Sequence, residues 1–395
     1  IYLPMDDADL SPIWSPSGTR TGRKKRGGGA SSSWRKNYLE SGKTFRLTRA
    51  PFGVPGLPDG LRGLKILHLS DLHGMRFGER NKALAASILA ESPDLILATG
   101  DMCDDRGEDG RGAFPELLEG LGGQIPVCAS VGNHEKYLLK SRPEDYADYH
   151  RALKARGAAV LDNSSVYLRL RGTGICLYGF SRTNGPASLK TVRALLGDCP
   201  RNAPVFVLSH HPKWFDALEE WGACAVFSGH LHGGLIRLPL LGGVLSPSLT
   251  LFPRYDKGIF RLPRAAMHLS AGFGDSSLRL RLCNPREANL LILEPASGRR
   301  QRASESERVL RAALAGICAL SAAAGLRLLF TRTFPYGGLA AALAFGGLTL
   351  LLLRPFALAR RRGSRRGRAL RRWGTRLLCL GAAAGSVLWL IFSGA

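Results

Sequence analysis

The sequence predicts an α/β fold with a mostly parallel sheet for the middle of this 395-residue chain. From Leu64 onward, short apolar runs alternate with stretches of helical spacing, which is the pattern of strand–helix–strand units. Clusters of His, Asp and Asn directly follow several of the apolar runs, where α/β folds place their sites. Hydrophobic residues make up 45% of the chain and charged residues 22%, which excludes a disordered or low-complexity protein.

Each expected strand is a short apolar run bounded by polar or turn-forming residues. A first strand begins around 44–47, and the run 64–69 (LKILHL) is typical of a strand that is buried on both faces. The other expected strands are 94–98, 127–131, 166–170, 175–178, 205–208, 225–227, 267–270 and 289–293. Helical spacing of apolar residues predicts helices at 81–89, 143–156 and 189–196.

Residues 1–43 are expected to form a basic, poorly ordered arm. The segment 27–33 (GGGASSS) has the composition of a flexible linker, and it follows a short basic cluster at 23–26 (RKKR). No apolar segment follows the basic cluster, so the sequence predicts no signal peptide here. The second expected unit, the α/β domain, covers 44–298.

Residues 299–395 are predicted to form an Arg-rich membrane region with two or three transmembrane helices. The segments 336–353 and 377–395 contain 18 and 19 residues without a charge, and about 18 apolar residues suffice to cross a bilayer. The segment 309–330 is a weaker third candidate, because Arg311 and Arg327 lie near its ends, where they could reach the membrane surface. The alternative is a buried helical hairpin of a soluble domain.

The net charge of +24 belongs to the two ends of the chain. Residues 299–395 carry 17 Arg against two Glu, whereas 61–298 carries 28 basic and 24 acidic residues, a net of only +4. A basic tail beside apolar runs favours contact with a membrane surface over a nucleic-acid duplex. We therefore expect the membrane as a partner and no specific nucleic acid.

The charge pattern also predicts a multi-pass topology. Ten Arg and no acidic residue lie between Leu353 and Leu377, and the positive-inside rule keeps such a loop in the cytoplasm. If 309–330 also spans the membrane, the α/β domain lies on the cytoplasmic face; if it does not, the domain lies outside. The eight Cys are scattered without a CxxC pair, which suits a reducing compartment and favours the cytoplasmic arrangement.

Five polar motifs that follow expected strands indicate a metal site. They are DLH at 71–73, GD at 100–101, GNHE at 132–135, SHH at 209–211 and GHLH at 229–232. DLH or GD alone is common as a surface turn, whereas GNH is rarer and GHLH rarer still. The joint appearance of the motifs in this order is difficult to explain by chance. Carboxylate, imidazole and amide ligands without thiolate favour Mn, Fe or Zn over soft ions. One carboxylate can bridge two ions about 3.5–4 Å apart, the separation used in two-metal phosphoester cleavage.

The order D-x-H, G-D, G-N-H-E, H and G-H-x-H resembles the calcineurin-like metallophosphoesterase superfamily over roughly 44–296. The segments 229–239 (GHLHGGLIRLP), 252–255 (FPRY) and 283–287 (CNPRE) resemble its bacterial membrane-associated branch, which includes enzymes resembling UDP-2,3-diacylglucosamine hydrolases. The resemblance implies a four-layer α/β/β/α sandwich with a two-metal centre between its sheets.

The resemblance also implies a role for each motif residue. One divalent ion is assigned to Asp71, His73 and His232, and a second to Asn133, His210 and His230. Asp101 bridges the two ions. His134 matches the non-ligating His that protonates the leaving group or stabilises the transition state. His211 stands where this branch leads us to expect Arg, which leaves the contacts to substrate phosphate at that position open.

The remaining polar residues near the motifs receive simpler interpretations. His68 lies inside an expected strand and is interpreted as a packed core residue, and His150 is expected to be solvated on a charged helical face. His268 lies in a late strand without an assigned role. Glu135 and Asp104 are expected to orient ligands or loops rather than to bind metal.

The function implied by the resemblance is hydrolysis of a phosphomonoester, a phosphodiester or a pyrophosphate by a hydrolase with two divalent ions. A membrane tether favours a lipid or lipid-linked substrate. The alternative is a catalytically weak, membrane-anchored protein that binds metal or nucleic acid. Two observations oppose this alternative: no ligand position has been lost, and the core carries too little positive charge for a nucleic-acid binder.

Overall fold

A computed structural model of the chain describes residues 36–37, 45–104, 109–238, 242–247, 249–250, 253–274 and 281–296. All of them lie in the first of the two units into which the chain divides, Ile1–Arg302. The three predicted transmembrane segments, 309–330, 336–353 and 377–395, lie outside the described residues, as does most of the predicted arm. Among the helices that are described, none is both long enough and apolar enough to cross a membrane.

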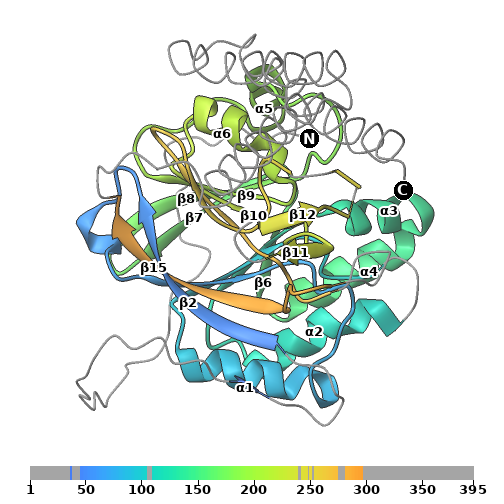
Figure 1. The fold of residues 1–395 in the computed structure, drawn as a ribbon. Helices are drawn as coiled ribbons and strands as arrows, with labels where there is room; N and C mark the ends of the chain where they lie inside the picture. Colours follow the sequence, from blue (N-terminus) through green and yellow to red (C-terminus); the bar gives the residue numbers. More distant parts are fainter. Residues whose placement is uncertain are drawn as a thin grey trace, which may run out of the picture. The chain divides into compact units, whose positions relative to one another are not determined.

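The first sheet has seven strands and joins the start of the domain to its end (Figure 1). Its strands, in spatial order, are β1 (Lys36–Asn37), β2 (Phe45–Val54), β15 (Glu287–Pro295), β3 (Lys65–Leu69), β4 (Leu95–Thr99), β5 (Val127–Ser130) and β6 (Ala158–Leu161). Strands β3 to β6 are parallel to one another. The last strand, β15, lies between β2 and β3, parallel to the former and antiparallel to the latter.

The second sheet has six strands with a parallel centre. In spatial order they are β13 (Gly258–Arg261), β14 (Ala266–Leu269), β10 (Ala225–Ser228), β9 (Val205–Ser209), β8 (Thr173–Phe180) and β7 (Ser165–Leu170). The inner four are parallel, and the two edge strands are antiparallel to their neighbours. A separate ribbon pairs β11 (Ile236–Leu238) with β12 (Gly242–Leu245). The predicted α/β class is confirmed, with two mixed sheets in which the antiparallel members were not foreseen.

Alternation of side chains along the strands explains why these strands are apolar throughout. In β4, Leu95 and Leu97 join a cluster of buried residues that both sheets share, whereas Ile96 and Ala98 pack against helices. In β9, Phe206 and Leu208 point into the same shared cluster, and Val205 and Val207 point to the opposite face. The two sheets therefore face each other across one apolar layer, in which Phe52 of β2 contacts Phe227 of β10 at a ring-centroid distance of 5.5 Å.

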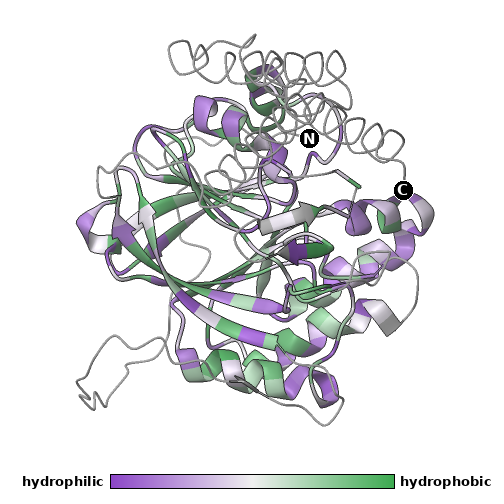
Figure 2. Cartoon of the chain, in the orientation of Figure 1, coloured by the Kyte–Doolittle hydropathy of each residue, from purple (hydrophilic) through white to green (hydrophobic). Residues whose placement is uncertain are grey.

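Helices cover the face of each sheet that points away from the shared layer. Buried residues of α1 (Lys82–Glu91), α2 (Asp109–Leu121) and α4 (Pro143–Ala155) cluster with the first sheet. Those of α5 (Leu189–Leu196) and α6 (Phe215–Trp221) cluster with the second. Short 3-10 helices lie at Asp59–Leu61, Glu79–Asn81 and Pro212–Trp214. Hydrophobic residues (green in Figure 2) accordingly run along the central strands and α1, while α3 (Asn133–Ser141) is largely hydrophilic.

The helices predicted from spacing are confirmed, and three others were missed. The expected segments 81–89, 143–156 and 189–196 correspond to α1, α4 and α5. The sequence of α2 contains Gly110, Gly112 and Pro115, which obscure a helical pattern. The short helices α3 and α6 have only nine and seven residues. Such lengths give few repeats of the helical period.

Candidate metal centre

The residues of the five polar motifs come together at the carboxyl ends of five parallel strands. In the first sheet, β3 leads to Asp71 and His73, β4 to Asp101, and β5 to Asn133 and His134 at the start of α3. In the second sheet, β9 leads to His210, and β10 leads to His230 and His232. Because β3, β4 and β5 are neighbours and β9 and β10 are neighbours, their loops converge at one end of the two facing sheets.

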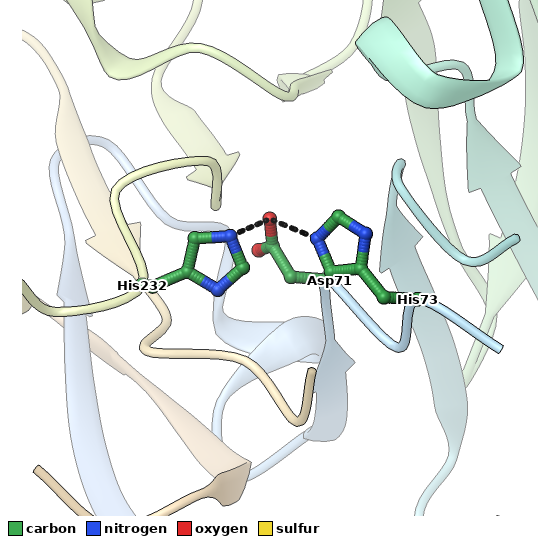
Figure 3. Close-up of side chains that lie close together, drawn as sticks. All are labelled: Asp71, His73 and His232. Carbon is green, nitrogen blue, oxygen red and sulfur yellow. Dashed lines mark ion pairs between the residues drawn. The ribbon is translucent and has the colours of Figure 1, made fainter. Parts of the chain in front are cut away.

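Asp71, His73 and His232 form the first of two ligand groups, and their side chains converge on a single oxygen (Figure 3). Oδ1 of Asp71 lies 3.9 Å from Nε2 of His73 and 3.6 Å from Nε2 of His232. These separations are too long for hydrogen bonds, but two ligands at about 2.0–2.2 Å from one ion can span them. The geometry therefore suits a metal ion better than direct contact.

Asp101, His210 and His230 form the second group, to which Asn133 adds its side-chain oxygen. Oδ2 of Asp101 lies 3.0 Å from Nε2 of His210, and Oδ1 of Asn133 lies 2.9 Å from Nδ1 of His230. Nδ1 of His210 donates to the Thr99 carbonyl at 2.7 Å, which leaves Nε2 to face the site. Burial opposes a charge on His210, but the carboxylates of Asp101 and Asp71 raise its pKa to about 10. A metal ion would take the place of that proton.

Asp101 lies between the two groups. Its Oδ2 is 3.9 Å from Nε2 of His73 as well as 3.0 Å from Nε2 of His210, so one oxygen faces both sets of ligands. Its Oδ1 accepts a hydrogen bond from the backbone N–H of His134 at 2.8 Å, which fixes the plane of the carboxylate. His73, Asp101 and His134 also form a third close group, so geometry alone leaves ligation by His134 possible.

The residues present fit divalent metal ions. Both ring nitrogens of His73 are buried, and neither has a hydrogen-bond partner among the described residues. Burial lowers the pKa of His73 to about 4, against the attraction of Asp101, so the ring is neutral and keeps a lone pair. A buried polar group without a partner costs free energy, and coordination of an ion removes that cost. Neutral imidazole, carboxylate and amide oxygen together match Mn, Fe or Zn.

The backbone at the site is in a conformation that L-residues avoid. Asp71, His73, Asp101, His230 and His232 have φ values of 51°, 46°, 51°, 71° and 49°. Left-handed backbone at a residue with a Cβ costs roughly 1–2 kcal/mol, and such residues cluster at functional sites. The turns that place the ligands are therefore held by the surrounding fold against a local preference.

Glu135 holds two of the ligand loops together. Its carboxylate accepts hydrogen bonds from the backbone N–H groups of Asp101, Met102, Cys103 and Gly132, at distances between 2.7 and 3.2 Å. Glu135 thus connects the loop after β4 to the start of α3, in agreement with its expected orienting role. The role of Asp104 stays a prediction.

Two glycines of the motifs permit close approach between the loops. A Cβ at Gly229 would lie 1.9 Å from Oγ of Ser70 and 2.3 Å from Oδ2 of Asp71. A Cβ at Gly132 would lie 2.3 Å from Oδ1 of Asp101. Both distances are far below van der Waals contact, so the G-H-x-H and G-N-H motifs need glycine at these positions for a packing reason.

Two residues that support the site were not assigned from the sequence. Nδ2 of Asn284 donates to the backbone oxygens of His232 and Gly234, and so holds the loop after β10. Asn284 belongs to the CNPRE segment, whose resemblance to a family motif was the available signal. Arg281 donates to the Ala271 carbonyl and lies 3.3 Å from Nδ1 of His232. Burial and then Arg281 lower the pKa of His232.

Three of the other histidines lie in three different environments. His68 is fully buried, as predicted. The prediction for His150 is wrong in part: the residue is half-buried, its ring packs 4.1 Å from that of Tyr146, and its Nε2 is buried. His211 packs 4.3 Å from the ring of His230, and its Nδ1 accepts from the backbone N–H of Lys213. It therefore lies against a proposed ligand.

Comparison with known proteins adds four observations. Residues 64–234 match the family model described as calcineurin-like phosphoesterase. The chain is 30% identical to the phosphodiesterase YaeI of Escherichia coli, over 65% of this chain and 91% of that protein. It is 26% identical to the UDP-2,3-diacylglucosamine pyrophosphatase LpxG of Chlamydia trachomatis, over 66% of this chain and 92% of that protein. A Danio rerio transmembrane protein with a metallophosphoesterase domain is 27% identical over 62% of this chain, which spans only 56% of that protein.

Proposed function

Because this chain belongs to the calcineurin-like phosphoesterase family and is a hydrolase of phosphoester bonds, we propose that it uses two divalent ions to cleave a phosphomonoester, a phosphodiester or a pyrophosphate. The observation that carries the proposal is that Oδ2 of Asp101 lies between two groups of candidate ligands, 3.9 Å from Nε2 of His73 and 3.0 Å from Nε2 of His210. Two divalent ions bound there would activate water for attack and neutralise charge on the phosphoryl oxygens. Manganese, iron and zinc all suit the donor set.

Each side chain then has one proposed task. Asp71, His73 and His232 hold one ion, and Asn133, His210 and His230 hold the other, with Asp101 between them. His134 is proposed as the proton donor to the leaving group, since its ring packs edge-on against His73 at 4.5 Å and remains partly exposed. This position lets the His134 ring reach a substrate that is bound to the two metal ions.

A lipid-linked substrate is the finer part of the proposal. Tyr137 and Leu282 are large side chains with apolar surface, and each is 50% exposed. Tyr137 lies one turn after His134 on α3, and Leu282 pairs with the chain just after His232 through the backbone N–H of Arg237 and the oxygen of Leu235. Apolar surface thus lies on two segments that carry site residues. The likeness to LpxG, whose name gives an acylated nucleotide sugar as its substrate, supports the same class.

The full chain, loaded with Mn²⁺, is expected to hydrolyse UDP-2,3-diacylglucosamine faster than UDP-N-acetylglucosamine, which lacks the long acyl chains. Product release is measured by chromatography, beside p-nitrophenyl phosphate and bis-p-nitrophenyl phosphate as a monoester and a diester. Equal rates on the acylated and unacylated sugars would refute the lipid-linked class. No hydrolysis of any of the four compounds would refute the phosphoesterase itself.

We also propose that residues 299–395 anchor the enzyme with its catalytic domain on the cytoplasmic face. The ten Arg between Leu353 and Leu377 keep that loop in the cytoplasm, and the domain lies on the same side if 309–330 and 336–353 both span the membrane. Protease added to intact spheroplasts is then expected to leave the catalytic domain uncut until the membrane is broken. Digestion without lysis would place the domain outside. A periplasmic protein that is digested and a cytoplasmic protein that is not serve as controls in the same sample.

A further inference from the structure

Four buried polar side chains form a chain of hydrogen bonds that ends on Asp71. Nδ1 of His268 lies 2.7 Å from Nδ1 of His68, and Nε2 of His68 lies 2.8 Å from Oγ1 of Thr99. Oγ1 of Thr99 is 2.8 Å from Oγ of Ser70, which is 2.6 Å from Oδ2 of Asp71. None of the five residues is more than 4% exposed.

This chain of side chains crosses the apolar layer between the two sheets. His268 comes from β14 of the second sheet, whereas His68 and Thr99 come from β3 and β4 of the first. The rings of Phe227 and Phe52 pack edge-on against His68 and His268, at centroid distances of 5.5 and 6.4 Å. In such apolar surroundings a polar group needs a hydrogen-bond partner from the protein, and water does not compete for these hydrogen bonds.

The carboxylate of Asp71, at the end of this chain of hydrogen bonds, fixes the direction of each hydrogen bond in the chain. Ser70 donates its one hydrogen to Oδ2 of Asp71, since a carboxylate oxygen accepts hydrogen bonds. Ser70 then accepts from Thr99, whose other acceptor, the Leu69 carbonyl, is farther away at 3.5 Å. With its own hydrogen given to Ser70, Thr99 accepts from Nε2–H of His68.

The same reasoning sets the tautomers of both histidines. A neutral His68 that is protonated on Nε2 has a lone pair on Nδ1, so it must accept from Nδ1–H of His268. Burial supports the neutral forms, since it places the pKa of His68 well below its ordinary value and that of His268 at about 4. All four bonds therefore run in one direction, from His268 to Asp71.

We propose that His268, His68, Thr99 and Ser70 are positioning residues that orient the Asp71 carboxylate toward a metal ion. Ser70, the last of them, donates to Oδ2, while Oδ1 faces His73 and His232, at 3.9 and 3.6 Å. The backbone N–H of His230 lies 3.1 Å from both oxygens, so the Ser70 hydroxyl is the contact that distinguishes Oδ2 from Oδ1. The inference rests on the proposed function, because it takes Asp71 as a metal ligand. Groups that hydrogen-bond a ligand in this way typically change metal affinity about 10–100-fold when they are removed.

The variants His268→Phe and Ser70→Ala each remove one donor from the chain. Mn²⁺ titration of the full-length protein by calorimetry is expected to show one of two sites weakened about 10–100-fold in each. His268→Asn is expected to restore the affinity, because its amide N–H can replace Nδ1–H. Ser130→Ala is the matched control. Ser130 ends β5 and is as buried as the four hydrogen-bonded side chains, but its Oγ has no hydrogen-bond partner among the described residues. Thermal melting checks that each variant is folded.

A second measurement needs neither metal nor activity. In the metal-free protein labelled with ¹⁵N-histidine, NMR is expected to find His68 protonated on Nε2 and His268 on Nδ1. His68 protonated on Nδ1 would overturn the inference, and so would wild-type Mn²⁺ affinity in both His268→Phe and Ser70→Ala. If the wild-type protein bound no Mn²⁺, the proposed metal function would fail together with the positioning role, even though the tautomers could still be as stated.

Discussion

Asp101→Ala is expected to leave the protein unable to retain two divalent ions. One carboxylate oxygen of Asp101 faces both ligand groups, so its loss removes a ligand and a compensating charge from each ion at once. Metal analysis after loading with Mn²⁺ and dialysis is expected to find fewer than two ions per chain. The rate of hydrolysis should fall by at least about a thousandfold, because several kcal/mol of charge stabilisation in the transition state are lost. Each loss of about 1.4 kcal/mol lowers a rate tenfold.

Asp148→Ala is the matched control for this variant. Asp148 is an exposed carboxylate on α4 that pairs with Arg151 and lies outside the ligand groups. It should retain both ions and full activity. Two tightly bound ions in Asp101→Ala would contradict the bridging assignment, whatever happened to the rate.

His134→Ala is expected to keep both ions and to lose catalysis. If His134 donates a proton to the leaving group, kcat should fall by roughly 10²–10⁴ for a substrate with a poor leaving group. The loss should be much smaller for p-nitrophenyl phosphate, because p-nitrophenolate departs without needing a proton. Steady-state rates on both kinds of substrate, with metal content measured on the same preparation, check this.

Two different results would contradict the role of His134. Loss of an ion would make His134 a ligand, an outcome that its proximity to His73 and Asp101 keeps open. Equal loss on good and poor leaving groups would exclude proton donation and leave only stabilisation of the transition state. Asp101→Ala and His134→Ala therefore separate binding of the ions from use of the proton.

Most of the candidate site could be predicted from the sequence because its residues follow apolar strands directly. The carboxyl ends of parallel strands meet at one edge of a sheet, so Asp71, Asp101 and Asn133 are brought together by topology alone. The same reasoning applies to His210 and His230 in the second sheet. The face-to-face packing of the two sheets was predicted only from the resemblance to the family. No local sequence pattern encodes which faces of two sheets pack together.

Unlike the orienting role of Glu135, the roles of the four proposed positioning residues could not be predicted, for a physical reason. His68 and His268 are hydrogen-bonded across 200 positions in the sequence. A single His within an apolar run gives no sign of its partner. Ser70 and Thr99 end strands, where small polar residues are common. The strand at 289–293 was expected, but its antiparallel pairing with β3 was not, because its apolar run is indistinguishable from that of a parallel strand.

The left-handed backbone at five ligand positions has a consequence for the evolution of this chain. At each of these positions, Gly would adopt the same turn without steric conflict, so most replacements toward Gly would relieve strain of roughly 1 kcal/mol. Mutational drift in a chain freed from selection for activity would therefore tend to erase the ligands while making the fold more stable. The Asp and His at these five turns are therefore kept at a cost to the stability of the fold of roughly 1 kcal/mol each.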